Sequence, residues 1–211
     1  VNLTVSGDGM LVNNVPELQG TLSVANFSPQ QLLKALGEEP VDTQDNAVLQ
    51  RAELQGDWTL VGDKAALENL VSRVDDTGIK GWVRAASIEQ EQLVFDLQID
   101  ALDLDRYSAP AKTTVETATG GDPVASQPGF GLPLEQLRSL DLEGRVAIGN
   151  LTVAEAELSE VLVKLRIQQG QLRLNPLNAK LDGSNYSGDV RLDATTDQPK
   201  LAFDLRVDNL D

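Results

Sequence analysis

The sequence of 211 residues contains no cysteine and no histidine. The chain therefore cannot form disulfides, thiolate nucleophiles or Ser-His-Asp catalytic groups, and it lacks the ligands of nearly all zinc sites. Only 4% of the residues are aromatic, so the 41% hydrophobic content comes mostly from Leu, Val, Ala and Ile. No apolar run approaches the roughly 20 residues of a membrane-spanning helix, and no signal peptide is visible.

Basic residues are scarce as well. The chain has 17 Lys and Arg against 33 Asp and Glu, which gives a net charge of −16. Nucleic acid is not an expected partner, because binding a phosphate polyanion needs clustered basic residues and the sequence shows no such cluster. The same negative field should repel an anionic bilayer surface.

One block of residues occurs twice, at 79–103 and again about a hundred residues later. In both copies apolar residues occupy every other position, a period of two that predicts a strand with one buried face. The parity flips near the end of each copy, at Leu102 and Leu210, which predicts a bulge or bend used twice. The repetition indicates an array of strands whose function resides in a surface rather than in a few catalytic side chains.

Strand signals dominate the rest of the chain. Alternating apolar runs predict further strands at 18–24, 54–60, 142–148 and 161–174, the last interrupted by a hairpin turn at 168–170.

Helix signals are few. Ser28 and Pro29 suit the start of a helix near 28–36, and a second short helix is expected near 133–140. Residues 64–70 fit either a helical turn or a strand.

The composition divides the chain in two. Residues 108–131 are rich in Ser, Thr, Ala, Pro and Gly and predict a flexible linker or loop. It separates an N-terminal β-rich half, residues 1–107, from a C-terminal β-rich half, residues 132–211, and each half ends in the repeated block.

Several carboxylates are candidates for metal ligands or acid/base groups. Asp96 and Asp100 alternate with apolar residues, which is typical of a solvated strand face. Asp103, Asp105 and Tyr107 imitate the start of a calcium loop but lack its third oxygen ligand, its glycine and its distal Glu. We therefore expect no catalytic residue, no metal site and no cofactor.

Ordered segments across nearly the whole chain resemble the AsmA family. The longest is LPLEQLRSLDLEGRVAIGNLTV at 132–153, followed by GQLRLNPLNAKL at 170–181. FSPQQLLKALG at 27–37, DDTGIKG at 75–81 and DALDLDRY at 100–107 complete the resemblance.

The resemblance implies a protein of the Gram-negative cell envelope. AsmA-like proteins are held in the inner membrane by an N-terminal helix, absent from this sequence, and project into the periplasm. They are similar to bridge-like lipid-transfer proteins, whose long twisted sheets curl into a hydrophobic groove. They are linked to outer-membrane assembly and to phospholipid traffic between the two membranes, and membership implies no enzymatic activity.

We expect a mainly β fold, an elongated, twisted antiparallel sheet that forms a half-barrel or groove and carries two or three short α-helices. A closed sandwich with an ordinary core is the architectural alternative. The largest apolar side chains, Trp58, Trp82, Phe95 and Phe203, are expected to fill a core unless the apolar faces join into an open channel.

The expected function is that of a non-enzymatic periplasmic segment that shields phospholipid acyl chains in a hydrophobic β-groove. The alternative is a scaffold that binds outer-membrane proteins or envelope assembly factors through its strand edges. A third hypothesis, a calcium-dependent adhesion-like module, predicts stabilisation by calcium. The side chains expected to face lipid alternate within the repeated blocks: Val83, Leu93, Phe95, Leu97, Ile99, Val190, Leu201, Phe203, Leu205 and Val207.

Overall fold

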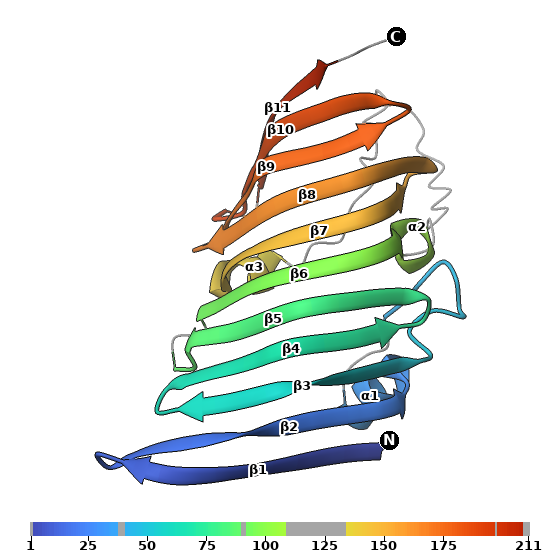
Figure 1. Cartoon of the computed structure of the whole chain (residues 1–211). Coiled ribbons are helices and arrows are strands. Elements are labelled where there is room, and N and C mark those ends of the chain that lie inside the picture. The colour runs from blue at the N-terminus through green and yellow to red at the C-terminus, as the bar shows by residue number, and fades with distance from the viewer. Residues whose placement is uncertain (1, 38–40, 90–91, 109–133, 197, 209–211) are drawn as a thin grey trace.

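The chain folds into one open, twisted sheet of eleven strands with three short helices (Figure 1). The computed structural model describes residues 2–37, 41–89, 92–108, 134–196 and 198–208. The strands are β1 (Asn2–Val12), β2 (Val15–Phe27), β3 (Ala52–Val61), β4 (Lys64–Val74), β5 (Thr77–Ser87), β6 (Gln92–Asp103), β7 (Asp141–Val153), β8 (Ala156–Gln168), β9 (Gln171–Leu181), β10 (Ser184–Asp193) and β11 (Lys200–Asp208). The helices are α1 (Pro29–Ala35), α2 (Leu104–Tyr107) and α3 (Leu134–Ser139).

The strands lie in the sheet in the order in which they occur in the chain. Every neighbouring pair is antiparallel except β6 and β7, which run parallel. A parallel pair needs a long crossover, and the connection that contains α2 and α3 supplies it. The structure thus confirms the mainly β, mostly antiparallel prediction and replaces the alternative of a closed sandwich with a single open layer.

Both halves of the sequence contribute strands to this one sheet. Strands β1–β6 come from residues before 108 and β7–β11 from residues after 140, and β6 pairs with β7 along its length. The linker predicted at 108–131 lies outside the described residues except for Ser108, whose amide and hydroxyl both donate to the Leu104 carbonyl at the end of α2.

Tight hairpin turns connect many of the strands. Positive φ at two successive residues, as at Asn13 and Asn14, gives the type I′ geometry that matches the twist of the flanking strands. Ala154 and Glu155 adopt the same geometry between β7 and β8, although neither residue favours it. The Asp105 carboxylate accepts both of their backbone N–H groups, at 2.7 and 2.8 Å, and so holds this turn in place from α2.

The helices follow local sequence signals only in part. The helix expected near 28–36 is α1, where Ser28 caps the Gln31 amide at 3.3 Å and Pro29 occupies the first turn. The helix expected near 133–140 is α3, and residues 64–70 lie in strand β4 rather than in a helical turn. Helix α2 was not predicted from the sequence, because its four residues are too few to show a helical period.

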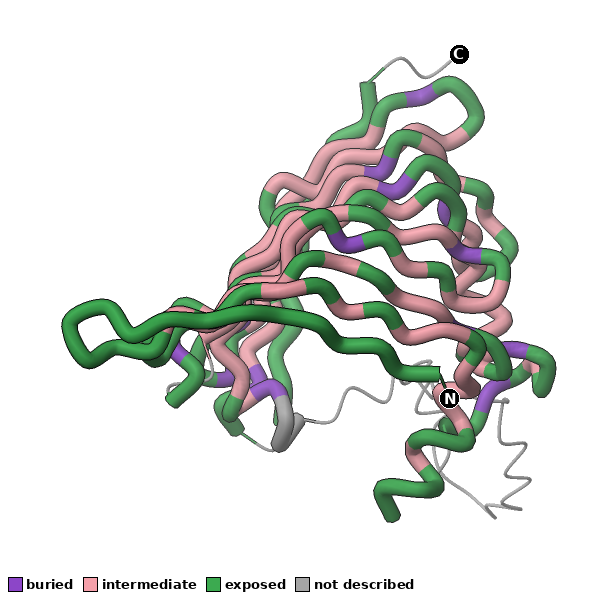
Figure 2. The backbone as a smooth tube through the Cα atoms, turned by 60° about the horizontal axis from the view of Figure 1, so that its bottom comes forward, coloured by how far each residue is buried: buried purple, intermediate pink, exposed green. Residues whose placement is uncertain are grey.

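The sheet is bent (Figure 2), and several of its strands contain irregularities in their pairing. Asn69 in β4 and Glu160 in β8 have positive φ and sit where the pairing register shifts, which marks them as bulges. In β6 the parity change predicted from Leu102 occurs at Asp100, where the ladder with β7 skips one pair. The corresponding position in the second copy, Leu210, lies outside the described residues.

Few of the described residues are buried, and those that are lie mainly toward the strand ends (Figure 2). Leu137 of α3 packs with Ile167 and Ala194 in one small cluster. Ile148, Leu151 and Val161 form a second cluster, which also contacts Leu104 of α2. These residues anchor the helices to the sheet and do not form a central core.

Candidate functional site: the two faces of the sheet

The pairing register places apolar side chains on one face across all eleven strands. Residues paired across neighbouring strands point to the same face. One continuous row crosses β1 to β8 and consists of Leu3, Val24, Leu54, Ser72, Ile79, Ile99, Ile148 and Val161. A second row crosses β5 to β11 and consists of Gly81, Leu97, Val146, Val163, Leu177, Gly188 and Leu205. Ser72 is the only polar side chain in these rows, and we call this side of the sheet the apolar face.

All ten side chains that the sequence assigned to a lipid-facing surface belong to the apolar face. The two copies of the repeat even share their cross-strand pairs, because Val83 pairs with Phe95 as Val190 pairs with Phe203. The repeated block is therefore one hairpin design used as β5–β6 and again as β10–β11.

The two hairpins differ in exposure. Phe95 and Leu97 are half-buried, since β7 continues the sheet beside them. Phe203 is 67% exposed and Leu205 53%, because β11 is paired on one side only among the described residues.

The apolar face is not sealed by other described parts of the chain. Along β3 to β10 most of its side chains are half-buried rather than buried. Helices α2 and α3 pack on this face only at the two clusters described above. Between them lies a wide expanse of aliphatic side chains, which is the arrangement that an extended apolar ligand requires.

Two aromatic rings lie flat on this face above glycines. Phe95 of β6 covers Gly144 of β7, where any Cβ would collide with the ring. Trp58 of β3 reaches across β2 to Gly7 of β1, where a Cβ would lie 2.7 Å from its ring. Because these glycines have no side chain, the large rings can lie close to the backbone instead of projecting from the apolar face. The Trp58 Nε1 atom is buried and finds no acceptor among the described residues.

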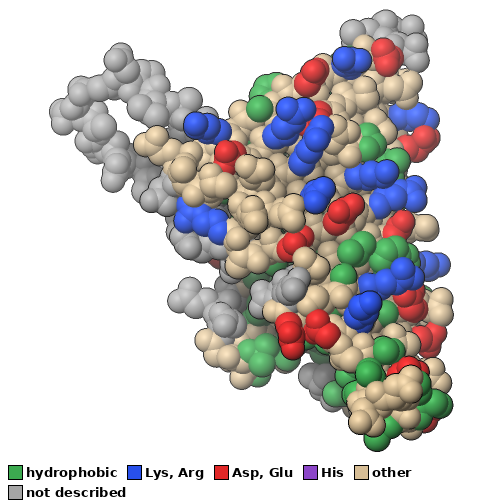
Figure 3. All heavy atoms as spheres, turned by 90° about the vertical axis from the view of Figure 1, so that its left-hand side faces the viewer, with side chains coloured by type: hydrophobic (Ala, Val, Ile, Leu, Met, Phe, Trp, Pro, Cys, Tyr) green, Lys and Arg blue, Asp and Glu red, His purple; other side chains and the backbone are tan. Residues whose placement is uncertain are grey.

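The opposite side, which we call the polar face, carries most of the charges of the sheet. Figure 3 shows Lys and Arg side chains gathered in a band along one side of the molecule, with Asp and Glu beside them. Trp82 was expected to fill a core, but alternation in β5 places it on this polar face, with the Arg84 guanidinium 4.2 Å from its ring centroid. Such a cation–π contact stabilises a ring that is only half-buried.

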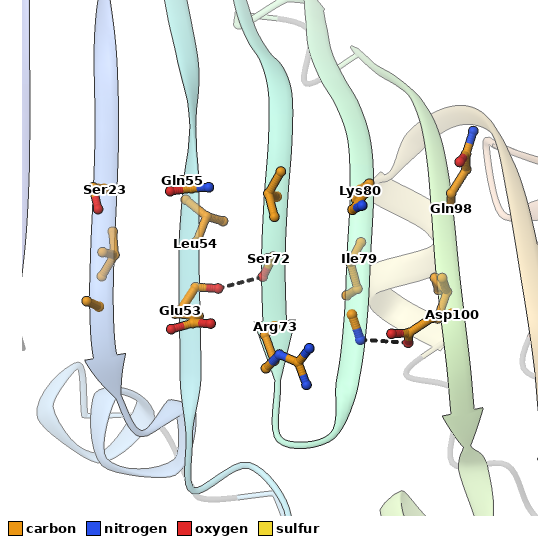
Figure 4. A pocket seen from close by; sticks show the side chains of 15 residues that line it. Ser23, Glu53, Leu54, Gln55, Ser72, Arg73, Ile79, Lys80, Gln98 and Asp100 are labelled. Carbon is orange, nitrogen blue, oxygen red and sulfur yellow. Dashed lines mark hydrogen bonds between the residues drawn. The ribbon is translucent and has the colours of Figure 1, made fainter.

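One hollow of the polar face crosses β2 to β6 and has a volume of about 680 Å³ (Figure 4). Its charged side chains balance, because Glu53 and Asp100 stand beside Arg73 and Lys80. The Asp100 carboxylate accepts the backbone N–H of Gly78 at 2.7 Å, and this hydrogen bond, followed by that from the Ala101 amide, lowers the pKa of Asp100. Its carboxylate thus supports the bend in β6.

Aspartates also bind successive turns to one another at the ends of the strands. Asp75 accepts backbone N–H groups from Leu49, Gln50 and Arg51 and the hydroxyl of Tyr107. These four bonds attach the segment before β3 to the β4–β5 turn and to α2.

A second carboxylate makes a similar connection at the other end of the strands. Asp63 accepts the Ser87 hydroxyl at 2.6 Å and the amides of Ile88 and Glu89. The bond from Ser87, and then that from Glu89, lowers the pKa of Asp63.

The imitation of a calcium loop has a structural explanation. Asp103 caps α2 by accepting the Asp105 amide at 3.1 Å, while Asp105 holds the β7–β8 turn. Within the described residues no group of three or more Asp and Glu side chains could hold a metal ion. The same part of the chain has no helix long and apolar enough to cross a membrane.

Comparison with known proteins identifies the family of this chain. The family model of the AsmA family matches residues 31–211, and the chain belongs to this family. It is also similar to Protein AsmA of Escherichia coli (strain K12), with 21% identity over 213 residues. That match covers 92% of this chain and 34% of the relative, so the chain spans about a third of that protein's length. No solved structure matches significantly.

Membership of the AsmA family suggests a function related to the cell envelope. The features that sequence reasoning missed are Trp82 on the polar face and the grouping of basic side chains there. Alternation within 79–85 carried the signal for Trp82, since Trp82 falls out of phase with Val83 and its apolar neighbours.

Proposed function

We propose that this chain is a non-enzymatic, periplasmic segment of an envelope protein that shields phospholipid acyl chains on its apolar face. In this role it contributes to lipid transport between the inner and outer membranes and to outer-membrane assembly. AsmA-family membership supports an envelope-related role, and the lipid-shielding role rests on the geometry of the sheet.

The observation that carries the proposal is the continuity of the apolar face. Rows of aliphatic side chains cross every strand in register, are mostly half-buried along β3 to β10, and are interrupted by one serine and by glycines. The face has no charged group in these rows that would trap a headgroup, so neighbouring positions offer an acyl chain similar binding energies.

Length and energy are compatible with this role. Ten spacings of about 4.8 Å make the sheet roughly 48 Å across its strands, whereas one leaflet occupies about half of a hydrocarbon core of roughly 30 Å. The apolar face is thus about three times as long as an acyl chain. A 16-carbon chain left in water costs about 13 kcal/mol, at about 0.8 kcal/mol per methylene. Partial burial on this face offsets part of that cost without fixing the lipid at one position.

Site-specific photo-crosslinking tests the proposal. A benzophenone amino acid replaces Phe95 on the apolar face in one variant and Gln98 on the polar face of the same strand in another. After expression in a Gram-negative periplasm and irradiation, mass spectrometry should find phospholipid attached at position 95 and none at position 98.

The controls separate lipid binding from misfolding. Both variants should have the circular dichroism spectrum and melting temperature of the unmodified chain. Equal labelling at the two positions, or no phospholipid at position 95 in a folded protein, would refute acyl-chain shielding.

A second candidate function, a scaffold that binds outer-membrane proteins by strand addition, is favoured by the two outer strands. All residues of β1 and β11 are exposed, and each strand pairs on one side only among the described residues. An unpaired strand edge is a template for an extended peptide. Crosslinks from β11 to a client protein, without lipid at position 95, would support the scaffold instead.

A further inference from the structure

The register assembles a group of basic side chains that is dispersed in the sequence. On the polar face Arg166 of β8 pairs with Arg173 of β9, which in turn pairs with Arg191 of β10. Two residues from Arg166 in β8, Lys164 lies opposite Arg145 of β7. We call these five residues the cation cluster.

Like charges placed directly opposite each other across strands are destabilising. The chain has 33 acidic residues with which to avoid such pairs. Elsewhere on the sheet basic side chains bond carboxylates at short distance, since Arg84 bonds Glu68 at 2.6 Å and Lys180 bonds Glu160 at 2.7 Å. Among the acidic residues, Asp57 lies opposite Glu68 and Asp189 opposite Asp204. Two adjacent like-charge rows are therefore an arrangement that stability alone does not favour.

Carboxylates of the chain neutralise the cation cluster only in part. Asp189 binds Arg173 at 2.6 Å and Arg191 at 2.8 Å, and these two hydrogen bonds hold the pKa of Asp189 far below its usual range. The other contacts are long: Arg145 lies 3.6 Å from Asp96, and Arg166 lies 4.0 Å from its carboxylate partner in β7.

Among the described residues the Lys164 ammonium group has no hydrogen bond or ion pair, although Arg145 lies opposite it. Five cations thus face four carboxylates, Asp96, Glu143, Asp189 and Asp204, in a chain whose net charge is strongly negative.

The cation cluster borders a hollow of about 590 Å³ over β5 to β9. Arg145, Lys164, Arg166 and Arg173 line it, together with the carboxylates Asp96 and Glu143, so cations outnumber anions in the lining by four to two. Trp82 and Val94 lie at one end. The hollow has the size of a small-molecule site. Guanidinium groups match phosphate and carboxylate oxygens through paired N–H donors.

We propose that this hollow binds a small anion that carries two or more phosphate or carboxylate groups. A membrane surface does not fit, since the net charge of the chain repels anionic headgroups at a distance. The headgroup of a lipid on the apolar face does not reach it either, because the sheet itself lies between the two faces. At physiological ionic strength the Debye length of about 8 Å screens the carboxylates outside the hollow, while the four cations that line it outnumber its two carboxylates at contact distance.

Titration with pyrophosphate in 0.15 M NaCl tests the proposal. Trp82 lines the hollow and reports binding by fluorescence once Trp58, the other tryptophan, is replaced by Phe. We expect saturable binding and an affinity about tenfold lower in Lys164→Gln, the loss typical of one charged hydrogen bond. Arg206→Gln, on the polar face of β11 and outside the hollow, is the matched control and should leave the affinity unchanged.

A second measurement protects the test against unfolding. Because Arg145→Gln removes one member of a like-charge pair, it should weaken pyrophosphate binding without lowering the melting temperature of the ligand-free protein. Absence of saturation, equal weakening by Arg206→Gln, or tighter binding of a single-stranded oligonucleotide would overturn the proposal. Lipid labelling from position 95 should be unchanged in Lys164→Gln, so the failure of this inference and of lipid shielding can be told apart.

Discussion

The contact between Phe95 and Gly144 gives a quantitative test of how the apolar face is built. A Cβ added at Gly144 would lie closer than 3.0 Å to three atoms of the Phe95 ring, a separation that real Cβ atoms essentially never show. In an ordinary strand a glycine-to-alanine change stabilises by about 0.5–1 kcal/mol, because the unfolded chain loses freedom. Here Gly144→Ala should destabilise the protein, because the ring must leave its place.

The magnitude follows from the geometry. Overpacking of this kind costs about 1–3 kcal/mol. Phe95→Ala alone should cost about 2 kcal/mol, roughly half of the loss for a fully buried Phe, since the ring is half-buried. In the double variant the clash is absent, so the two changes should cost less together than their sum, by about 1–3 kcal/mol.

Chemical denaturation of the four proteins measures this coupling, and thermal melting supports it at about 2–4 °C per kcal/mol for a domain of this size. Equal effects of Gly144→Ala in the presence and absence of the Phe95 ring would refute the reasoning. So would a Gly144→Ala variant that is more stable than the unmodified chain.

Three further predictions concern the apolar face and the turns. Leu97→Asp should abolish lipid labelling at position 95 while the chain stays folded, with a loss of about 1 kcal/mol in folding stability for the half-buried side chain. Gln98→Asp on the polar face should change neither the labelling nor the fold. Mass spectrometry measures the labelling and circular dichroism the fold. The pKa of Asp63 is lowered in the fold, so its stabilisation is present above pH 3.8 and is lost as pH falls through the lower folded value. Melting curves between pH 7 and pH 2 should therefore show a smaller acid-induced loss in Asp63→Asn than in the unmodified chain. Asp75→Asn should weaken bonds worth about 1.5–3 kcal/mol each and speed amide exchange at Leu49 and its neighbours, while exchange in the central strands stays slow.

The apolar face was predictable because it depends on a local rule. Alternation in the two copies of the repeat identifies which side chains share a face, and the register brings Phe95 and Phe203 to equivalent positions. Turn residues such as those at 168–170 placed a hairpin correctly for the same reason, since the signal lies within a few neighbouring residues. What alternation could not give is the parallel pairing of β6 with β7, which depends on a crossover of more than thirty residues.

The cation cluster was not predictable because it depends on register between strands. Lys164 and Arg166 lie two apart in one strand. Arg145 lies 19 residues before Lys164, Arg173 lies seven residues after Arg166 across a turn, and Arg191 lies 18 residues after Arg173. A search of the sequence for basic runs therefore finds nothing. Shifting the register of β9 by one residue would move Arg173 to the apolar face. The register that aligns the aliphatic side chains on the apolar face therefore also brings the basic side chains together on the polar face.

One layer of backbone carries an apolar face and a polar face, and this arrangement relates the small number of buried residues to the bonds at the strand ends and to the acidic composition. The described residues place no continuous layer over the apolar face, which therefore gains little stability from a core, and only nine hydrophobic residues are buried among those described. Stability must then come from backbone pairing and from the strand ends, where Asp63, Asp75 and Asp105 each accept two or more hydrogen bonds from a neighbouring turn or segment. Those carboxylates contribute to the negative charge that keeps an exposed apolar surface soluble. The acidic composition thus suits an apolar face that the described residues leave open, and it leaves room for the few cations to gather on the polar face.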